Sequence, residues 1–357
     1  MDEIPKEQLV IQNDMSVFNT LKADVKTGHE LGAGSYWEKK YKVIERSIAK
    51  FGLARFRGDS SYIGTSSADN HYIDIRSFLI TFPFNLLRWL LKLQPVALVF
   101  NKQVELTDRY LNELIDFQKQ HILSQPELIS LVGKYRFSNI SNDGAKDTIL
   151  LDNESVTLSQ LRYLDMHLGL SDSINFSEIY SVLEVGGGYG AHADFLIQNY
   201  PNIRKFVYVD MFPLLYVGIQ YLKSIHGDAV KVVTDAQSSS ILLASPFKDD
   251  DSLEIICMSP HLLDNVRVEF DLCLSCNAFQ EMAIDTVADY ANIFDEKLSD
   301  QGSIGLVCYS DSDGITQLSY DAVRSVFSVK FDYVSKRSRF DLTKGYDFLT
   351  FKKDTSI

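Results

Sequence analysis

The pattern of apolar and polar positions along the chain changes near residue 179. Downstream, short apolar runs alternate with longer segments in which apolar residues recur at helical spacing. The runs predict strands at residues 180–185, 206–209, 253–258, 270–275 and 303–309, and the segments between them predict helices at 191–200, 213–225 and 285–298. Alternating strands and helices are joined by right-handed crossovers, so we expect a parallel sheet with helices on both faces.

The strands at the two ends of this sheet depart from the alternating pattern. The last two apolar runs, 325–334 and 346–351, follow each other without a long helix between them, so they can pair only as an antiparallel couple. At the other end, the run at 230–235 is an alternative to 253–258 for the third strand. We prefer 253–258, because it comes shortly before the strand at 270–275.

The first 150 residues have mainly helical patterns and loops. The sequence Thr157-Leu158-Ser159-Gln160 is typical of a capping box, and we expect the helix that it starts to end at Gly169. Residues 141–146 are rich in turn formers and suit a linker. We therefore predict a mainly helical region at 1–150, which shapes a substrate site or mediates self-association, and a ligand-binding domain at 151–357.

The charge and cysteine content narrow the class of protein. The formal net charge is −13, which repels phosphate backbones and argues against sequence-independent binding to nucleic acids. The first residues lack the basic and then apolar layout of a signal peptide. All four cysteines fall in apolar runs, where buried free thiols are common. These features favour a cytoplasmic location.

The most apolar stretch is 78–100, but two prolines and several polar side chains interrupt it. It therefore cannot span a bilayer as one apolar helix. Our preferred interpretation is a helix that packs on the core or on a second subunit, and a helix on a membrane surface is the alternative.

The most informative motif is Glu184-Val185-Gly186-Gly187-Gly188-Tyr189-Gly190, at the end of a predicted strand. Glycines at a strand-to-helix turn let the backbone approach a ligand closely and adopt positive φ angles without steric cost. The following helix directs free N–H groups at that ligand. The glycine spacing alone suits a nicotinamide cofactor equally well.

Two acids help to distinguish the ligands. Glu184 lies two residues before the first glycine, where its carboxylate would oppose a pyrophosphate but suits a cationic ammonium group. Asp210 ends the next predicted strand and can accept hydrogen bonds from both hydroxyls of a ribose in either cofactor. Glu184 therefore favours S-adenosylmethionine over a nicotinamide cofactor.

These residues resemble a known family. The run from Glu184 to Gly190 resembles the first motif of class I S-adenosylmethionine-dependent methyltransferases, and Tyr208-Val209-Asp210-Met211 resembles the second. Residues 257–261 are similar to the third strand region of bacterial sugar O-methyltransferases. Residues 270–282, which end in Phe-Gln-Glu-Met, are similar to the fourth strand region of the same proteins. The resemblance covers 179–310 well and the N-terminal half only loosely, through residues 51–59. It implies an α/β fold: a Rossmann-like sheet of seven strands with an antiparallel last strand, preceded by a mainly helical N-terminal domain.

The resemblance also implies which residues bind the cofactor. Those at the methionine end of S-adenosylmethionine would be Glu184, Gly186 and Gly188, and Gly187 and Gly190 would also bind the cofactor. Asp210 would bind the ribose. The residues that would flank the adenine are Met211, Ser259 and Pro260. Asn277 would hold cofactor or acceptor by hydrogen bonds.

Methyl transfer to a hydroxyl needs a base near the carboxyl ends of the strands. Glu281 is the first candidate for this base and His261 the second, because each follows a predicted strand. His192 is expected to contact the glycine loop rather than to act as a base. Arg55 and Arg57 are candidates to bind a phosphate or carboxylate of the acceptor. No set of side chains in the sequence demands a metal ion.

The sequence therefore predicts an S-adenosylmethionine-dependent O-methyltransferase that acts on a sugar hydroxyl of a surface polysaccharide or of a nucleotide-sugar precursor. A methyltransferase for another small molecule, such as a polyketide or a lipid-linked acceptor, is one alternative. A non-catalytic cofactor-binding protein is another. The expected partner is a small-molecule or glycan acceptor rather than a nucleic acid, and the sequence leaves membrane association and homo-oligomer formation open.

Overall fold

A computed structural model describes residues 9–24, 35–54, 56–57, 94–141, 144–145, 147–151, 154–234, 247, 250–310, 317–328, 331–337 and 346–353. The chain divides into two compact units. The first comprises Met1–Asn13, Lys39–Lys134 and Asn139–Ser159, and the second comprises Asp14–Glu38, Tyr135–Ser138 and Gln160–Ile357. Residues 14–38 thus group with the C-terminal unit, although the sequence predicts a single boundary near residue 150.

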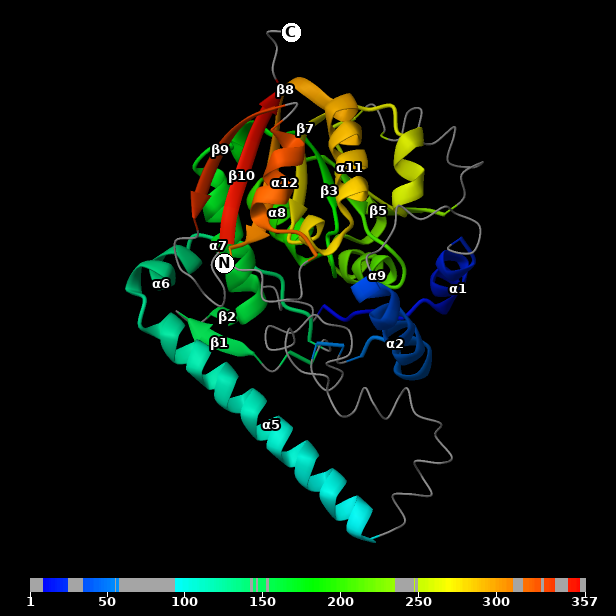
Figure 1. The fold of residues 1–357 in the computed structure, drawn as a ribbon, viewed down its shortest axis with the longest axis vertical. Helices are drawn as coiled ribbons and strands as arrows, with labels where there is room; N and C mark the ends of the chain where they lie inside the picture. Colours follow the sequence, from blue (N-terminus) through cyan, green and yellow to red (C-terminus); the bar gives the residue numbers. More distant parts are fainter. Residues whose placement is uncertain are drawn as a thin grey trace, which may run out of the picture. The chain divides into compact units, whose positions relative to one another are not determined.

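The first unit is mainly helical, as its sequence pattern predicts. It contains most of α2 (Ser35–Phe51), the 30-residue helix α5 (Gln94–Leu123) and the short helix α6 (Pro126–Val132) (Figure 1). A two-stranded antiparallel sheet, β1 (Thr148–Leu151) with β2 (Glu154–Thr157), is an addition that the sequence pattern does not predict.

The second unit is built on a mixed sheet of strands β3 to β10. Their order across the sheet is β5-β6-β4-β3-β7-β8-β10-β9. The first six strands are parallel, whereas β10 is antiparallel to both β8 and β9. The bounds are β3 Ser181–Val185, β4 Lys205–Val209, β5 Val230–Val233, β6 Glu254–Met258, β7 Phe270–Cys276, β8 Leu298–Tyr309, β9 Phe331–Arg337 and β10 Tyr346–Lys353.

This arrangement confirms the predicted Rossmann-like sheet with an antiparallel strand near one end. It also resolves the position of the third strand: β6 pairs with β4 in parallel, and β5 pairs with the outer side of β6. Both candidate runs are therefore strands. The preferred run takes the inner position, and the other adds an eighth strand at the edge of the expected seven-stranded sheet.

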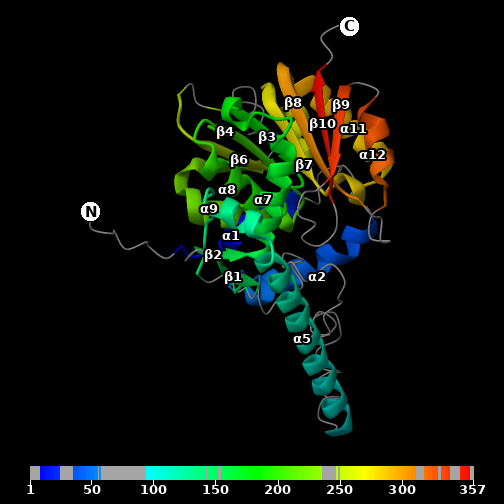
Figure 2. The same ribbon diagram turned by 90° about the vertical axis from the view of Figure 1, so that its left-hand side faces the viewer.

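Helices cover both faces of this sheet. Figures 1 and 2 show α11 (Ile284–Lys297) and α12 (Tyr320–Phe327) on one face, and α7 (Leu158–Ser171), α8 (Ala191–Asn199) and α9 (Leu214–His226) on the other. Because side chains alternate along a strand, Leu183 and Val185 join the core beneath α11 and α12. Full burial on both faces explains why these strands are continuous apolar runs rather than alternating ones.

Two sequence predictions about this unit are wrong in detail. The run at 325–334 is not one strand, because its first residues end α12, whose Val323 and Phe327 are buried; β9 begins only at Phe331. Gly169 does not end its helix, because α7 continues to Ser171. A Cβ on Gly169 would lie 2.4 Å from the ring of Phe348, so this glycine allows close helix–sheet packing instead.

One helix of the second unit comes from far upstream in the chain. Helix α1 (Met15–Asp24) buries Phe18 and Leu21. The ring centroid of Phe18 lies 5.1 Å from that of Phe212 and 5.2 Å from that of Tyr216, at the start of α9. This aromatic contact joins α1 to α9 within the second unit.

Within the described part of the chain, no helix is both long and apolar enough to cross a membrane. Most of the apolar stretch at 78–100 lies outside the described residues, which resume at α5.

Candidate functional site

The glycine motif forms the tight turn between β3 and α8. Gly186, Gly188 and Gly190 all have positive φ angles, of 77°, 63° and 89°. A Cβ on Gly186 would lie 2.3 Å from the Cβ of Ala278, whereas a Cβ on Gly188 would meet nothing within 4 Å. The loop is therefore packed against protein at Gly186 and faces open space at Gly188, as a loop that receives a ligand must.

Gly187 is fixed by packing rather than by its φ angle. A Cβ there would lie 2.2 Å from the ring of Tyr208 and 3.0 Å from Glu184 Oε2. The buried Tyr208 hydroxyl donates a hydrogen bond to the carbonyl oxygen of Gly188, at 2.5 Å. The loop thus rests on the ring of a residue in the neighbouring strand, β4.

Glu184 is almost completely buried at the carboxyl end of β3. Its Oε1 lies 2.7 Å from His192 Nδ1, and its Oε2 has no hydrogen-bond partner among the described residues. A buried carboxylate oxygen without a partner is costly. Glu184 therefore offers a strong acceptor to a cationic ligand at the glycine loop.

His192 contacts the loop acid, as the sequence analysis expects. Its Nδ1 also lies 3.7 Å from Cys276 Sγ, and its ring stacks on Tyr163 with centroids 5.6 Å apart. Burial lowers the pKa of the His192 imidazole, but the Cys276 thiol and the Glu184 carboxylate outweigh burial and raise that pKa to about 10. Held in this way, His192 fixes one oxygen of Glu184 and leaves the other for a ligand.

Asp210 follows β4 directly and is buried. Its Oδ2 accepts a hydrogen bond from Gly188 N at 2.7 Å, and its Oδ1 accepts one from Met211 N at 2.6 Å. Burial raises the pKa of the Asp210 carboxyl to about 7; the two backbone hydrogen bonds oppose this shift, and the charges of Glu184 and Glu281 add to it. Asp210 is therefore tied to the glycine loop and lies in the field of two other acids.

Met211, Ser259 and Pro260 are all buried. Ser259 follows β6 directly, and Pro260 starts the short 3-10 helix η5 (Pro260–Asn265). His261 is half-buried within η5, and its burial lowers the pKa of its imidazole. At neutral pH this histidine is therefore uncharged and able to accept a proton.

Asn277 follows β7 in a left-handed conformation, with φ 62°. Its backbone N donates to Val307 O at 2.8 Å, which joins the end of β7 to β8. Its buried Oδ1 has no hydrogen-bond partner among the described residues. Non-glycine residues with positive φ are uncommon and often mark functional turns, so this amide is suited to bind a ligand.

The Phe-Gln-Glu-Met segment contains one buried polar residue, Gln280, and one partly exposed polar residue, Glu281. Gln280 is fully buried; its Oε1 accepts from Tyr309 N at 2.5 Å, and its Nε2 donates to Tyr309 O at 3.2 Å. Glu281 is partly exposed at the end of the 3-10 helix η6 (Phe279–Glu281) and accepts a hydrogen bond from Trp37 Nε1. Trp37 carries no sequence signal, because it lies 244 positions before Glu281.

The predicted cofactor residues thus lie at one edge of the sheet. Strands β3, β4, β6 and β7 are parallel neighbours, so their carboxyl ends meet there. The residues that follow these strands are the glycine loop, Asp210, Ser259 and Asn277. Ligands of open α/β sheets bind at this edge.

The arginine candidates differ in outcome. Arg55 lies outside the described residues. Arg57 is buried in the first unit, where its Nη2 donates to Thr157 Oγ1 at 3.2 Å and to Ser159 Oγ, and lies 3.6 Å from Asp147 Oδ1. These contacts give Arg57 a structural role in its own unit.

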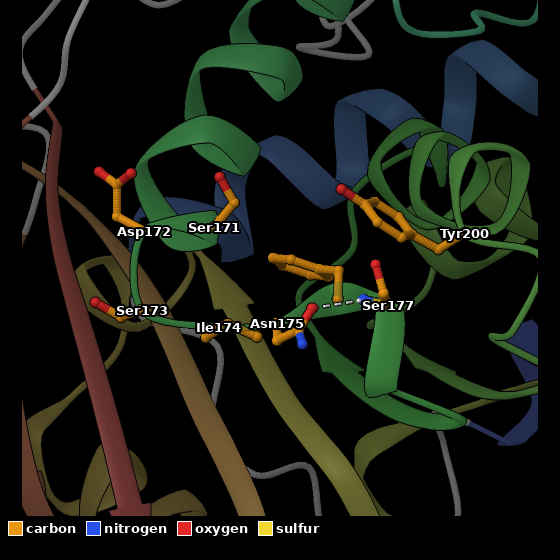
Figure 3. Close-up of a pocket in the computed structure, with 8 residues that line it drawn as sticks. Ser171, Asp172, Ser173, Ile174, Asn175, Ser177 and Tyr200 are labelled. Atoms are coloured by element: carbon orange, nitrogen blue, oxygen red, sulfur yellow. Dashed lines mark hydrogen bonds between the residues drawn. The ribbon is translucent and has the colours of Figure 1, made fainter.

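A pocket of about 320 Å³ lies elsewhere, at the amino end of β3 (Figure 3). Its lining consists mainly of short polar side chains between the end of α7 and the start of β3, with Tyr200 at the end of α8. Asn175 Oδ1 accepts a hydrogen bond from Ser177 N there, at 3.3 Å. Because this pocket lies at the opposite end of the strands from the glycine loop, it does not belong to the candidate site.

No protein-family model matches the sequence, and no curated protein matches it. Solved structures do match. The mitomycin 7-O-methyltransferase MmcR aligns with a TM-score of 0.37 and 9% identity, over 55% of this chain and 54% of that one. Human N-acetylserotonin methyltransferase, in complex with S-adenosylmethionine, aligns with a TM-score of 0.36 and 13% identity, over 55% and 54%. Magnesium protoporphyrin IX methyltransferase from Synechocystis PCC 6803 aligns with a TM-score of 0.37 and 9% identity, over 55% and 80%.

The aligned part spans about half the length of the first two structures.

Proposed function

We propose that the chain is an S-adenosylmethionine-dependent methyltransferase. The observation that carries this proposal is Glu184, a buried carboxylate beside the glycine loop with one oxygen unpartnered among the described residues. A cationic ammonium group can donate a hydrogen bond to this oxygen, whereas a pyrophosphate has only acceptor oxygens to offer it. The antiparallel β10 in the sheet also supports a methyltransferase over a nicotinamide enzyme.

The residues present fit this cofactor. Asp210 can accept ribose hydroxyls with its remaining lone pairs, and Gly188 faces open space on the side where a side chain would stand. Met211, Ser259 and Pro260 provide the buried surface for an adenine. Bound S-adenosylmethionine would supply an electrophilic methyl group on a positively charged sulfur.

We also propose that the acceptor is a sugar hydroxyl and that Glu281 is the base. As the new oxygen–carbon bond forms and the carbon–sulfur bond breaks, the hydroxyl proton passes to the Glu281 carboxylate. His261, half-buried and uncharged at neutral pH, is the second candidate. The sugar assignment is supported by the resemblance of residues 270–282 to sugar O-methyltransferases. It is also supported by the contact of Trp37 with Glu281, because the indole gives a sugar ring an apolar face to pack on and the carboxylate accepts hydrogen bonds from its hydroxyls.

The cofactor is tested by calorimetry with S-adenosylhomocysteine and with NAD. We expect the first to bind and the second not to bind. Gly188→Asn should weaken binding of S-adenosylhomocysteine at least about tenfold, because asparagine tolerates positive φ and would fill the open space. Gly133→Asn, also in open space but in the first unit, directly after α6, is the control. Equal affinity in the parent and in Gly188→Asn would remove the loop from the site.

The acceptor is tested with S-adenosylmethionine and a panel of monosaccharides and nucleotide sugars, with mass spectrometry to detect a methylated product. Phenols and lipid-linked alcohols form the comparison set. Methylation confined to the comparison set would refute the sugar assignment and keep the cofactor assignment intact.

A further inference from the structure

The described parts of residues 14–38 contact the chain directly after two of the site strands. Asp14 N donates to Gln220 Oε1 at 3.2 Å, and Phe18 packs on Phe212, two positions after Asp210. Farther along, Trp37 contacts Glu281, five positions after the end of β7. Phe18 and Trp37, both from the upstream segment, therefore contact residues that follow the carboxyl ends of β4 and β7.

The contact at Glu281 has the chemistry of a positioning bond. The Trp37 indole N–H donates to a carboxylate oxygen, and both residues are partly buried. Hydrogen bonds to a charged acceptor are stronger than neutral ones, and an indole can act only as a donor. The bond therefore orients the carboxylate of Glu281, which stands on a short 3-10 turn rather than on a long helix.

Electrostatics places the same carboxylate within the candidate site. The charge of Glu281 is one of the causes that raise the pKa of Asp210. Glu281 therefore lies close enough to the predicted ribose-binding acid for the two charges to interact.

We infer that Trp37 is the positioning residue for Glu281, and that Trp37 and α1 lie on the acceptor side of the site. This inference rests on the proposed function. The indole holds the base in one orientation, and its ring places an apolar surface beside that base. The acceptor class that fits is a hydroxyl carried on a ring, with one face against the indole and the hydroxyl at the carboxylate.

The contact itself can be tested without any substrate. The chain has two tryptophans, and replacing the second, Trp89→Phe, leaves Trp37 as the only indole. We expect Glu281→Gln in this background to shift the emission maximum of Trp37, because the indole N–H loses its charged acceptor. Glu178→Gln in the same background, which alters an exposed acid before β3, should leave the maximum unchanged. The same emission maximum in all three proteins would overturn the contact.

The role in catalysis is tested with the acceptor identified in the sugar panel. Trp37→Phe removes the N–H donor and keeps an aromatic ring, so kcat should fall about 10- to 100-fold. Affinity for S-adenosylhomocysteine, measured by calorimetry, should stay within about twofold of the parent. Tyr180→Phe, which removes an exposed aromatic hydroxyl that lies before β3 and donates to Asp251, is the matched control and should keep both values.

The outcomes separate the two proposals. If Trp37→Phe loses as much affinity for S-adenosylhomocysteine as it loses in kcat, Trp37 has a structural or cofactor-binding role. This outcome would overturn the positioning role. If the parent binds no S-adenosylhomocysteine, the proposed function fails, whereas the fluorescence experiment still decides whether Trp37 contacts Glu281.

Discussion

Asp210 combines two features with opposite effects on the pKa of its carboxyl. Both of its oxygens accept backbone hydrogen bonds, which favour the ionised form, yet burial raises the pKa of the carboxyl to about 7. Desolvation, with the help of two neighbouring acids, therefore outweighs the hydrogen bonds. The ionised form that would accept ribose hydroxyls forms only as the pH approaches neutrality.

This property predicts opposite pH trends for stability and for binding. A carboxyl with a higher pKa in the folded than in the unfolded state holds its proton more tightly when folded. The free energy of unfolding of the ligand-free protein should therefore fall as pH rises from 3.8 to about 7. Affinity for S-adenosylhomocysteine should rise over the same range, because the ionised form is the better acceptor.

Denaturant unfolding and calorimetry at several pH values measure the two trends, and Asp210→Asn is the test variant. It should unfold with a weaker pH dependence than the parent and bind S-adenosylhomocysteine more weakly near neutral pH. An unchanged pH dependence of unfolding in Asp210→Asn would contradict the assignment of the trend to this residue.

At the scale of elements, the edge strand β5 is joined to the sheet by a buried ion cluster. Lys205 Nζ of β4 lies 3.1 Å from Glu254 Oε2 of β6, and Lys231 of β5 contacts the other oxygen of Glu254. Lys205 and Glu254 are both almost fully buried. One carboxylate thus links three neighbouring strands.

Glu254→Ala should destabilise the protein by about 3 kcal/mol, because it removes the buried carboxylate of Lys205 and leaves that lysine the carbonyl oxygen of Ser252 at 3.3 Å and the exposed Asp250 at 3.8 Å. Asp321→Ala, which removes an exposed partner of Arg324 in α12, is the control and should cost at most about 1 kcal/mol. Denaturant unfolding measures both. Similar costs for the two variants would show that solvent reaches Lys205 and replaces the ion pair.

The sequence predicts these elements where burial on both faces makes a strand continuously apolar, as in β3, β4 and β6. It fails at α12, because an amphipathic helix of only eight residues next to a strand gives a mixed pattern. Its start does have a signal: Ser319 caps the helix by accepting a hydrogen bond from Ala322 N at 3.2 Å. Gly169 shows the opposite error, because a glycine required by packing looks like a helix stop.

In the candidate site, local sequence predicts the position of residues that end or follow strands: Glu184 lies within β3, and Asp210 and Asn277 follow β4 and β7. It is insufficient for Trp37, because that contact depends on how a distant segment packs. Burial also distinguishes arginines that bind other side chains of the protein from arginines that are free to bind a ligand, which the sequence cannot do. Arg57 looks like an acceptor ligand in the sequence, yet it binds side chains of its own unit.

At the scale of the whole molecule, the sheet unit depends on residues from far upstream. Phe18 is 2% exposed and packs on Phe212 and Tyr216. Phe18→Ala should therefore cost about 3–5 kcal/mol, as large-to-small changes in a core do. Asn19→Ala, exposed on the same helix, should change stability little. Circular dichroism during denaturant unfolding compares them, and equal midpoints would show that α1 adds nothing to the sheet unit.

Of the four cysteines in the chain, only Cys276 is suited to chemical labelling of the candidate site. Cys257, Cys273 and Cys308 are buried and burial raises the pKa of each thiol, whereas Cys276 is partly exposed beside His192. Iodoacetamide should therefore alkylate the native protein at Cys276 first, which peptide mass spectrometry can locate. S-adenosylhomocysteine should slow the reaction, and labelling elsewhere at the same rate would refute this selectivity. A fluorophore attached to this thiol would report occupancy of the glycine loop without any engineered cysteine.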